Sequence, residues 1–328
     1  MGGRRVIYNS KNMKIELLGA AATLLISVVA LVSAAYAWYV ANNTVQASTT
    51  TISATTNGFI LQIAKAEDGA QHGGEQMSLA ASNVGGRITP SSTNDLKDWY
   101  ICQGWGSDGR VTTYTKPVFA TGTGAKPGQY EAGGETHYAY IKSEYILYTI
   151  TETGAADVYL DASSGVSPIS VSVDNGKTPT STTVTDSMRI AITTQPLDTD
   201  GKTPTGIETL RVVYAPKAVT GSGNDTQAID GKWTYINVDK PAEVTYPHIH
   251  GDNYKDQNGK NWAATKSGED YKVEGGSEAI ATNVGYNGIM LRVYIWMEGT
   301  DADCVNNAAA EDEATYSVSV KFAGIQAN

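Results

Sequence analysis

The sequence has few of the side chains on which catalysis and metal binding depend: its 328 residues include four histidines and two cysteines. It contains no nucleophile elbow, P-loop, HExxH motif or dinucleotide-binding fingerprint. The histidines and the scattered carboxylates do not assemble into a recognisable catalytic arrangement. We therefore expect a protein that is not an enzyme, with no cofactor and no metal site.

Positive charge is scarce as well. The chain carries 24 lysines and arginines against 34 aspartates and glutamates, which gives a formal net charge of −10 and a pI of about 4.9. Proteins that bind nucleic acids present basic surfaces to the phosphates. The composition therefore predicts no nucleic-acid partner and favours a soluble surface on which like charges keep neighbouring molecules apart.

Convincing helical segments are missing after residue 41. The chain there is rich in Thr, Ser, Val, Tyr and Asn, which favour strands and turns. The clearest strand lies in 137–153, whose second half is apolar on both faces, as in a central strand. Ten or more short strands separated by turn signals predict a mainly β fold, an antiparallel β-sandwich.

Cysteine is nearly absent, and the two that occur are far apart, at Cys102 and Cys304. An even pair in an exported protein suggests one disulfide. That bond would close a loop of about 200 residues, which is worth roughly 4–5 kcal/mol in the chain-entropy model. The alternative is a pair of free buried thiols. We predict the disulfide and expect no zinc or redox chemistry, because neither cysteine has a C-x-x-C neighbour.

Charge is absent over one long stretch, between Glu16 and Lys65. Within it, residues 17–41 are mostly apolar and follow a basic flank, so we predict a hydrophobic helix over residues 13–41. The 25 residues of the run at about 1.5 Å each span roughly 37 Å, more than a hydrocarbon core of about 30 Å. Three interpretations stay open: an export signal, a membrane span through residues 17–41, and the core helix of a filament.

The end of this run contains a candidate cleavage site. An A-x-A sequence ends at Ala37, so a signal peptidase would cut between Ala37 and Trp38. The basic flank lies on the N-terminal side, which predicts export of everything that follows. The chain then divides into residues 1–41, the flank and hydrophobic helix, and residues 42–328, an extracellular β-sandwich domain with a long polar insertion at about 217–287.

The segment after the hydrophobic run is β-prone. Residues 44–55 carry no charge, no proline and no glycine. A strand of this kind can complete an exposed sheet edge in a neighbouring molecule. It can equally be the first strand of its own domain, and the sequence leaves both open.

Two tryptophans, Trp233 and Trp262, lie in the polar stretch 217–287. Aromatic rings in a polar loop can stack on sugars, so these two are the candidate ligand face of a binding protein. The other tryptophans of the strand-rich segments are expected in the core.

The junction AAYAWYVANNTVQASTTTISA resembles the export-signal boundary of the TasA–camelysin family, the biofilm-matrix fibre proteins of Gram-positive bacteria. The stretches LRVYIWMEGTDADC and YSVSVKF near the C-terminus also resemble surface proteins of clostridia-type bacteria. The family resemblance implies a jelly-roll-like β-sandwich. It also implies fibres in which the mature N-terminal segment of one subunit enters the sheet of the next.

A second resemblance concerns the helix. The sequence Ile15-Glu16-Leu17-Leu18 ahead of an apolar run is similar to the start of a type IV pilin. In such filaments a glutamate near the mature N-terminus pairs with the amine of a neighbouring subunit. A charge buried in a filament core needs a partner of this kind, which would explain Glu16.

These resemblances imply a structural subunit of an extracellular filament, pilus or biofilm-matrix fibre at the bacterial cell surface. It would be a head-to-tail homopolymer assembled through the N-terminal helix, the donated strand 44–55, or both. The residues expected at the subunit contact are Glu16, Leu17, Leu24, Val28, Leu31, Trp38, Tyr39, Val45 and Ile52. The alternative is a membrane-anchored surface binding module, an adhesin or a glycan binder, that uses Trp233 and Trp262.

Overall fold

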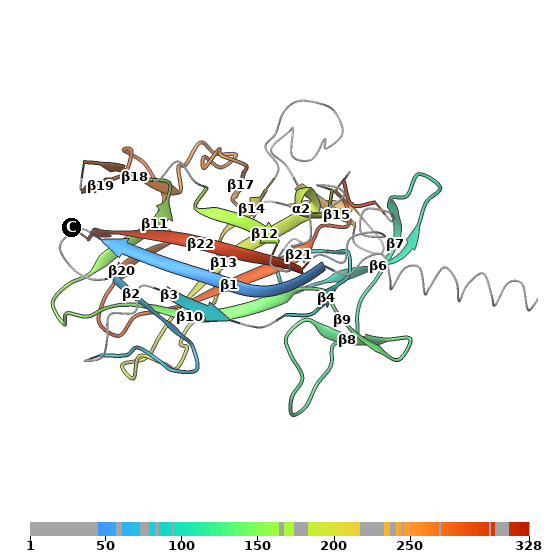
Figure 1. Ribbon diagram of the computed structural model, residues 1–328, viewed down its shortest axis with the longest axis horizontal. Helices are drawn as coiled ribbons and strands as arrows, with labels where there is room; N and C mark the ends of the chain where they lie inside the picture. The colour runs from blue at the N-terminus through green and yellow to red at the C-terminus, as the bar shows by residue number, and fades with distance from the viewer. Residues whose placement is uncertain are drawn as a thin grey trace, which may run out of the picture.

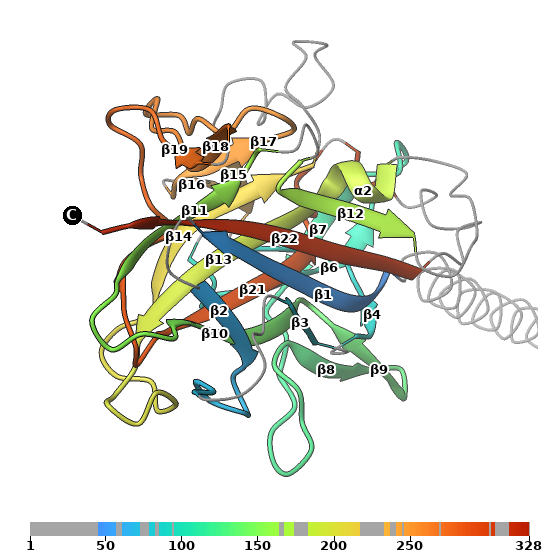
Figure 2. The same ribbon diagram turned by 60° about the vertical axis from the view of Figure 1, so that its left-hand side comes forward.

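The structure is a computed structural model, and Figures 1 and 2 show its elements from two directions. The residues that it describes are 45–56, 61–72, 79–82, 85–93, 95–163, 167–173, 183–216, 233–236, 241–244, 246–268, 270–301, 303–305 and 315–327. Strands make up nearly all of the regular structure in these residues. The β-branched and aromatic composition of the chain accounts for this, because such side chains pack well on a pleated surface.

Two large sheets dominate the molecule. The larger one has the order β19 (Asp270–Lys272), β18 (Ala263–Ser267), β11 (Ala156–Asp161), β22 (Thr315–Gln326), β1 (Val45–Thr56), β4 (Arg87–Ile88), β9 (Glu135–Tyr138) and β8 (Gln129–Ala132). Three more strands join it, namely β12 (Ile169–Val173) on β22, β20 (Ala281–Val284) on β11, and β3 (Leu79–Ser82) on β1. The smaller one has the order β17 (His248–His250), β14 (Thr209–Ala215), β13 (Met188–Pro196), β21 (Ile289–Met297), β10 (Ile141–Thr149) and β2 (Leu61–Lys65).

Two minor sheets and one short helix complete the described elements. The strands β5 (Ser91–Ser92), β6 (Tyr100–Trp105) and β7 (Val111–Thr115) form a three-stranded sheet. The strands β15 (Trp233–Ile236) and β16 (Pro241–Val244) form a two-stranded one. The helix α2 (Thr183–Ser187) precedes β13.

The main core lies between the two large sheets. Alternate residues of β10, including Tyr145 and Leu147, meet alternate residues of β22, including Val318 and Val320, in one apolar cluster. All four are at most 1 % exposed. Burying a large apolar side chain contributes about 1.5–3 kcal/mol. The two sheets are therefore held together by the period-two alternation of their strands.

The second face of the smaller sheet is buried too. Trp296 of β21 packs against Trp99, which precedes β6, with ring centroids 5.5 Å apart and planes at 87°. On β10, Ile146 and Tyr148 pack on this face with Met290. Burial on both faces confirms the sequence-based prediction of a central strand in the second half of 137–153.

The prediction of a mainly β protein is confirmed, but the predicted long hydrophobic helix is not. The longest helix among the described residues is α2, with five residues. None of the described helices is long and apolar enough to cross a membrane. Over the residues that the structure describes, the fold class is therefore corrected to a mainly β structure that contains no transmembrane or signal helix. The segment expected to form it, 13–41, lies outside the described residues.

The predicted all-antiparallel, jelly-roll-like sandwich is also corrected, because both large sheets are mixed. The parallel pairs are β1 with β22, β4 with β9, β11 with β18, and β14 with β17. Antiparallel pairing is imposed by tight turns between consecutive strands. These pairs join strands that are not consecutive in the chain, so no hairpin turn fixes their direction.

The polar stretch 217–287, expected to be an insertion, contributes strands to both large sheets. The strand β17 pairs with β14, and β18 and β20 pair with β11. Trp262 and Ile280 from this stretch belong to the main core. Its described residues are therefore part of the sandwich, because a few apolar side chains at the right register anchor an otherwise polar sequence.

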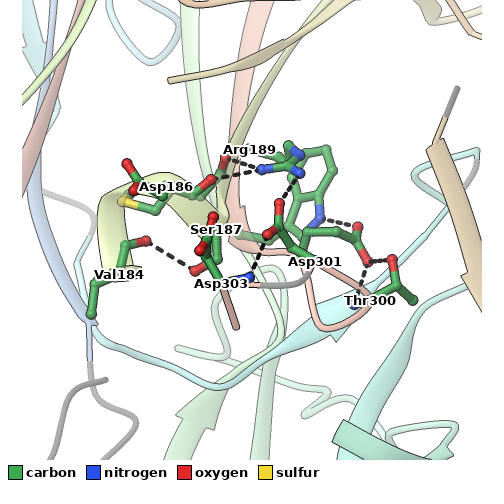
Figure 3. A network of polar contacts seen from close by, with 10 residues as sticks. Val184, Asp186, Ser187, Arg189, Thr300, Asp301 and Asp303 are labelled. Atoms are coloured by element: carbon green, nitrogen blue, oxygen red, sulfur yellow. Dashed lines mark hydrogen bonds and ion pairs between the residues drawn. The ribbon is translucent and has the colours of Figure 1, made fainter. Parts of the chain in front are cut away.

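A buried ion pair connects α2 and β13 to the chain that follows β21 (Figure 3). The guanidinium of Arg189 donates to the carboxylate of Asp301, and the two side chains are 1 % and 0 % exposed. Arg189 also donates to the carbonyl of Met188 at 2.9 Å, and Asp301 accepts from the backbone N–H of Asp303 at 2.8 Å. The pair thus fixes the loop that precedes β22.

A second buried carboxylate, that of Glu298, lies three residues before Asp301 in the same loop. Glu298 accepts hydrogen bonds from the indole N–H of Trp296 at 3.0 Å and from the hydroxyl and backbone N–H of Thr300 at 2.9 and 3.1 Å. Burial raises the pKa of Glu298 above its ordinary value, although the hydrogen bonds from Trp296 and from the Thr300 N–H and the charge of Arg189 act in the opposite direction. The loop 298–305 is therefore held by several buried polar contacts.

We predict that Asp301→Asn lowers the free energy of unfolding by about 3–5 kcal/mol, because it leaves the buried guanidinium of Arg189 without its counter-charge. Urea denaturation followed by tryptophan fluorescence measures this change. The double variant Arg189→Met with Asp301→Leu should lose less than the sum of the single variants Arg189→Met and Asp301→Leu, since neither partner of the ion pair is then left buried without the other.

The matched control is Glu135→Gln, which removes the carboxylate of an ion pair with Arg87 whose side chains are 50 % and 45 % exposed. Surface pairs of this kind contribute less than about 1 kcal/mol. If Asp301→Asn is no more harmful than Glu135→Gln, then the buried pair does not hold the loop before β22.

Candidate assembly interface

The strand β1 occupies an interior position in the larger sheet, visible in Figure 2 beside β22. On one side it pairs in parallel with β22 through nine residue pairs, from Gln46 with Thr315 to Thr56 with Gly324. On the other side it pairs antiparallel with β3 and β4. The first described strand of the chain therefore lies between the last strand and two strands from the 79–88 region.

The covalent attachment of β1 is short. Within the described chain β1 is followed by β2, after residues 57–60, and β2 belongs to the smaller sheet. No hairpin joins β1 to β22, β3 or β4, since each of these follows elsewhere in the sequence. The position of β1 is therefore maintained by backbone pairing and packing, and a strand of the same sequence from another chain would make the same pairs.

The surface that receives β1 is built mainly by β22. Tyr316, Val318, Val320 and Phe322 alternate along it and belong to the main core, each at most 1 % exposed. On its far side β22 is paired with β11 and β12, so both its position and its direction are fixed without β1. We call the space between β22 and the strands β3 and β4, which β1 fills, the β1 slot.

The β1 slot has a clear energetic consequence. Without β1, the backbone N–H and C=O groups along one edge of β22 would lack their sheet partners. A long unpaired edge with an apolar inner face recruits another strand, which is the basis of strand addition and of domain swapping. The molecule in the described arrangement fills this edge with its own strand.

Of the residues predicted at the subunit contact, the structure describes Val45 and Ile52. Val45 pairs with Ile88 of β4, and Ile52 pairs with Val320 of β22 and Ala80 of β3, all within the same chain. The alternative of an internal first strand is the arrangement seen here. The remaining predicted residues lie outside the described residues; these are Glu16, Leu17, Leu24, Val28, Leu31, Trp38 and Tyr39, together with the candidate cleavage site at Ala37 and Trp38.

The sequence analysis did not identify the partner strands of β1. The alternation in YSVSVKF indicates a strand with one buried face, and it forms most of β22. Its pairing with residues 46–56 joins segments more than 250 residues apart in the sequence. Nothing in the local pattern of either segment specifies that partner, because register and neighbour are set by the whole sheet.

The expected disulfide is not formed in the structure, where Cys102 and Cys304 are buried thiols that are not bonded to each other. Cys102 is in β6 and its thiol donates to the carbonyl of Gly104 at 3.8 Å. Burial raises the pKa of Cys102 to about 12 and also raises that of Cys304. The alternative of two buried thiols therefore describes this state of the protein.

Of the two tryptophans predicted as a ligand face, Trp262 is buried. It is 3 % exposed, donates its indole N–H to Asp256 at 3.0 Å, and lies under the guanidinium of Arg211 at 5.7 Å. A buried indole cannot stack on a sugar, so Trp262 is withdrawn as a ligand-facing residue. Trp233 begins β15, in the separate two-stranded sheet, and its predicted role stays a prediction.

Among the described residues, no group of three or more His, Cys, Asp or Glu side chains could hold a metal ion. Comparisons with protein-family models, with curated proteins and with solved structures find no match. The resemblance to the TasA–camelysin family therefore stays a prediction.

We predict that the two thiols of the native protein react very slowly with iodoacetamide. With a pKa of about 12, roughly one Cys102 thiol in ten thousand is ionised at pH 8, and the thiolate is the reactive form. Mass spectrometry after timed alkylation measures the rate, and unfolding the protein in guanidinium should accelerate it by several orders of magnitude. Labelling of the native protein at the rate of the unfolded chain would contradict this.

Proposed function

We propose that this protein is a non-enzymatic structural subunit of an extracellular fibre, in which β1 of one molecule fills the β1 slot of the next. The observation that supports this most is the interior position of β1, paired on both sides but linked to the described chain only through residues 57–60. The partners are further copies of the same chain.

Exchange of β1 conserves contacts. Each β1 that leaves its own slot is replaced by an identical strand, so the nine pairs with β22 are retained between molecules instead of within one. Association of two molecules costs translational and rotational entropy, and a high local concentration lowers this cost. Because the donor strand and the slot are different surfaces, the contact is head-to-tail and extends into a fibre rather than closing into a dimer.

The net charge fits a protein that assembles by a specific contact. At −10 the molecules repel each other at low ionic strength, which disfavours random aggregation. A donated strand adds many backbone hydrogen bonds at close range, which screening hardly affects. The extracellular location at a bacterial surface belongs to the same proposal and rests on the resemblance of the junction around Trp38.

A cysteine pair across the β1–β22 seam tests the exchange. Thr51 and Ser319 are direct partners in the parallel register. We predict that the double variant Thr51→Cys with Ser319→Cys, assembled and then oxidised, gives a ladder of covalent oligomers on a non-reducing denaturing gel. The introduced thiols then lie on different molecules.

The single variants Thr51→Cys and Ser319→Cys are the controls, and neither should give a ladder beyond dimers. The native thiols Cys102 and Cys304 are buried and do not compete. A double variant that yields only monomers, with the two introduced thiols joined within one chain, would contradict strand exchange.

Complementation in trans tests the slot itself. We predict that a chain lacking residues 1–56 unfolds at a lower temperature than the whole protein, because an edge of β22 is left unpaired. A synthetic peptide with the sequence of Val45–Thr56 should raise that temperature by several degrees, as expected for a ligand that binds only the folded state. Differential scanning calorimetry measures both effects.

The matched control is the same peptide with Ile52→Pro, at a position that pairs with Val320 of β22 and with Ala80 of β3. It should stabilise the truncated chain far less, because proline lacks a backbone N–H and is not tolerated in a strand that is paired on both sides. Equal stabilisation by both peptides, or none by either, would mean that the slot does not accept a separate strand.

A further inference from the structure

A pocket of about 380 Å³ lies where four parts of the fold meet, next to the β1 slot. One of its lining residues, Ser82 of β3, pairs with Thr50 of β1. Its walls come from the end of β2, the end of β3, β10 and the loop before β8. The residues that line it are Lys65, Ala66, Glu67, Ser82, Lys126, Pro127, Lys142 and Glu144. The volume is at the small end of the range for ligand-binding pockets, about 300–1,000 Å³, and is adequate for one sugar ring.

The charged side chains of this pocket differ in whether they already form ion pairs within the protein. Glu144 is held by Arg292 at 2.6 Å and by Lys142 at 3.0 Å. Burial tends to raise the pKa of Glu144, but the hydrogen bond from Arg292 and the charge of Lys142 prevail and keep it below the ordinary value. This carboxylate is therefore ionised and already paired.

The other two lysines of the pocket are Lys65 and Lys126. No ion pair is formed by Lys65 or Lys126 with any acidic side chain in the described part of the chain, although the molecule as a whole has an excess of acidic residues. Lys65 ends β2 and Lys126 lies in the loop before β8, and both residues line the same pocket. The ammonium group of each lysine has three hydrogen-bond donors. The pocket is thus a local positive site on an acidic protein.

The lining also supplies acceptors. Glu67 is exposed at the pocket and has only acceptor oxygens when ionised, while the hydroxyl of Ser82 both donates and accepts. A ligand that carries a single negative charge together with several hydroxyl groups would satisfy lysines and acceptors at once. A multiply charged anion such as phosphate would instead be repelled by Glu67 and Glu144.

We propose that this pocket binds an acidic sugar of the uronic-acid type, with its carboxylate between Lys65 and Lys126 and its hydroxyl groups toward Glu67 and Ser82. This goes beyond strand exchange and does not depend on it. A fibre subunit with such a site on every copy would contact acidic polysaccharide at regular intervals along the fibre.

The test is isothermal titration calorimetry of the whole protein with sodium glucuronate, glucose and inorganic phosphate as separate probes. We expect glucuronate to bind with a Kd in the range of about 1 mM, as is usual for a site with few contacts. Glucose and phosphate should each bind at least about tenfold more weakly. Raising the ionic strength should weaken the binding of glucuronate, because the pocket is open to solvent and its charges are screened.

The variant Lys65→Gln with Lys126→Gln should reduce glucuronate affinity by about tenfold or more, since it removes both charge-assisted hydrogen bonds to the carboxylate. The matched control is Lys272→Gln, an exposed lysine on β19 that is not part of the pocket, which should leave the affinity unchanged. Absence of binding, equal binding of glucose or phosphate, or insensitivity to the double change would each overturn the proposal. None of these results bears on the covalent ladder of the seam variants, so the two proposals fail separately.

Discussion

The structure depends on one pairing, in which the first described strand of the chain lies parallel to the last. The strand β22 is the central element of the larger sheet, with β1 along one edge and β11 and β12 along the other. It also supplies Tyr316, Val318, Val320 and Phe322 to the main core. Whatever strand fills the β1 slot therefore completes the larger sheet beside the core-lining strand β22.

The rest of the fold fixes the slot in place. The smaller sheet is buried on both faces, and its strand β21 leads into the loop 298–305, which the Arg189–Asp301 pair and the contacts of Glu298 immobilise. Buried ion pairs add little net stability, but breaking one is costly, so they favour a single arrangement of the chain around them. A rigid acceptor and a donor attached only through residues 57–60 are the two features that strand exchange needs.

Much of the fold could be predicted from local patterns of the sequence. The β content, the central character of β10 and the existence of strands at 45–56 and 315–326 all follow from residue type and period-two alternation. The prediction of only antiparallel neighbours was wrong because pairing between distant strands has no local signal. The polar character of 217–287 gave no indication that described residues of this stretch, such as Trp262 and Ile280, belong to the main core.

The candidate sites were less accessible to sequence reasoning than the fold. Residues 44–55 were predicted to be a strand, either donated or internal, from their lack of charge, proline and glycine, whereas the slot that β1 fills is defined only when β22 and β3 are placed on either side. The lysine-lined pocket had no signal at all, because Lys65, Lys126 and Lys142 are spread over 78 positions and meet only through the crossing of β2, β10 and the loop before β8.

The measurement that tests the central claim most directly is a cryo-electron microscopy reconstruction of the assembled protein at a resolution that traces the backbone. The account predicts that the strand beside β22 in each subunit continues, through residues 57–60, into β2 of a neighbouring subunit. A reconstruction in which that strand continues into β2 of the same subunit would contradict it, as would a protein that stays monomeric at high concentration.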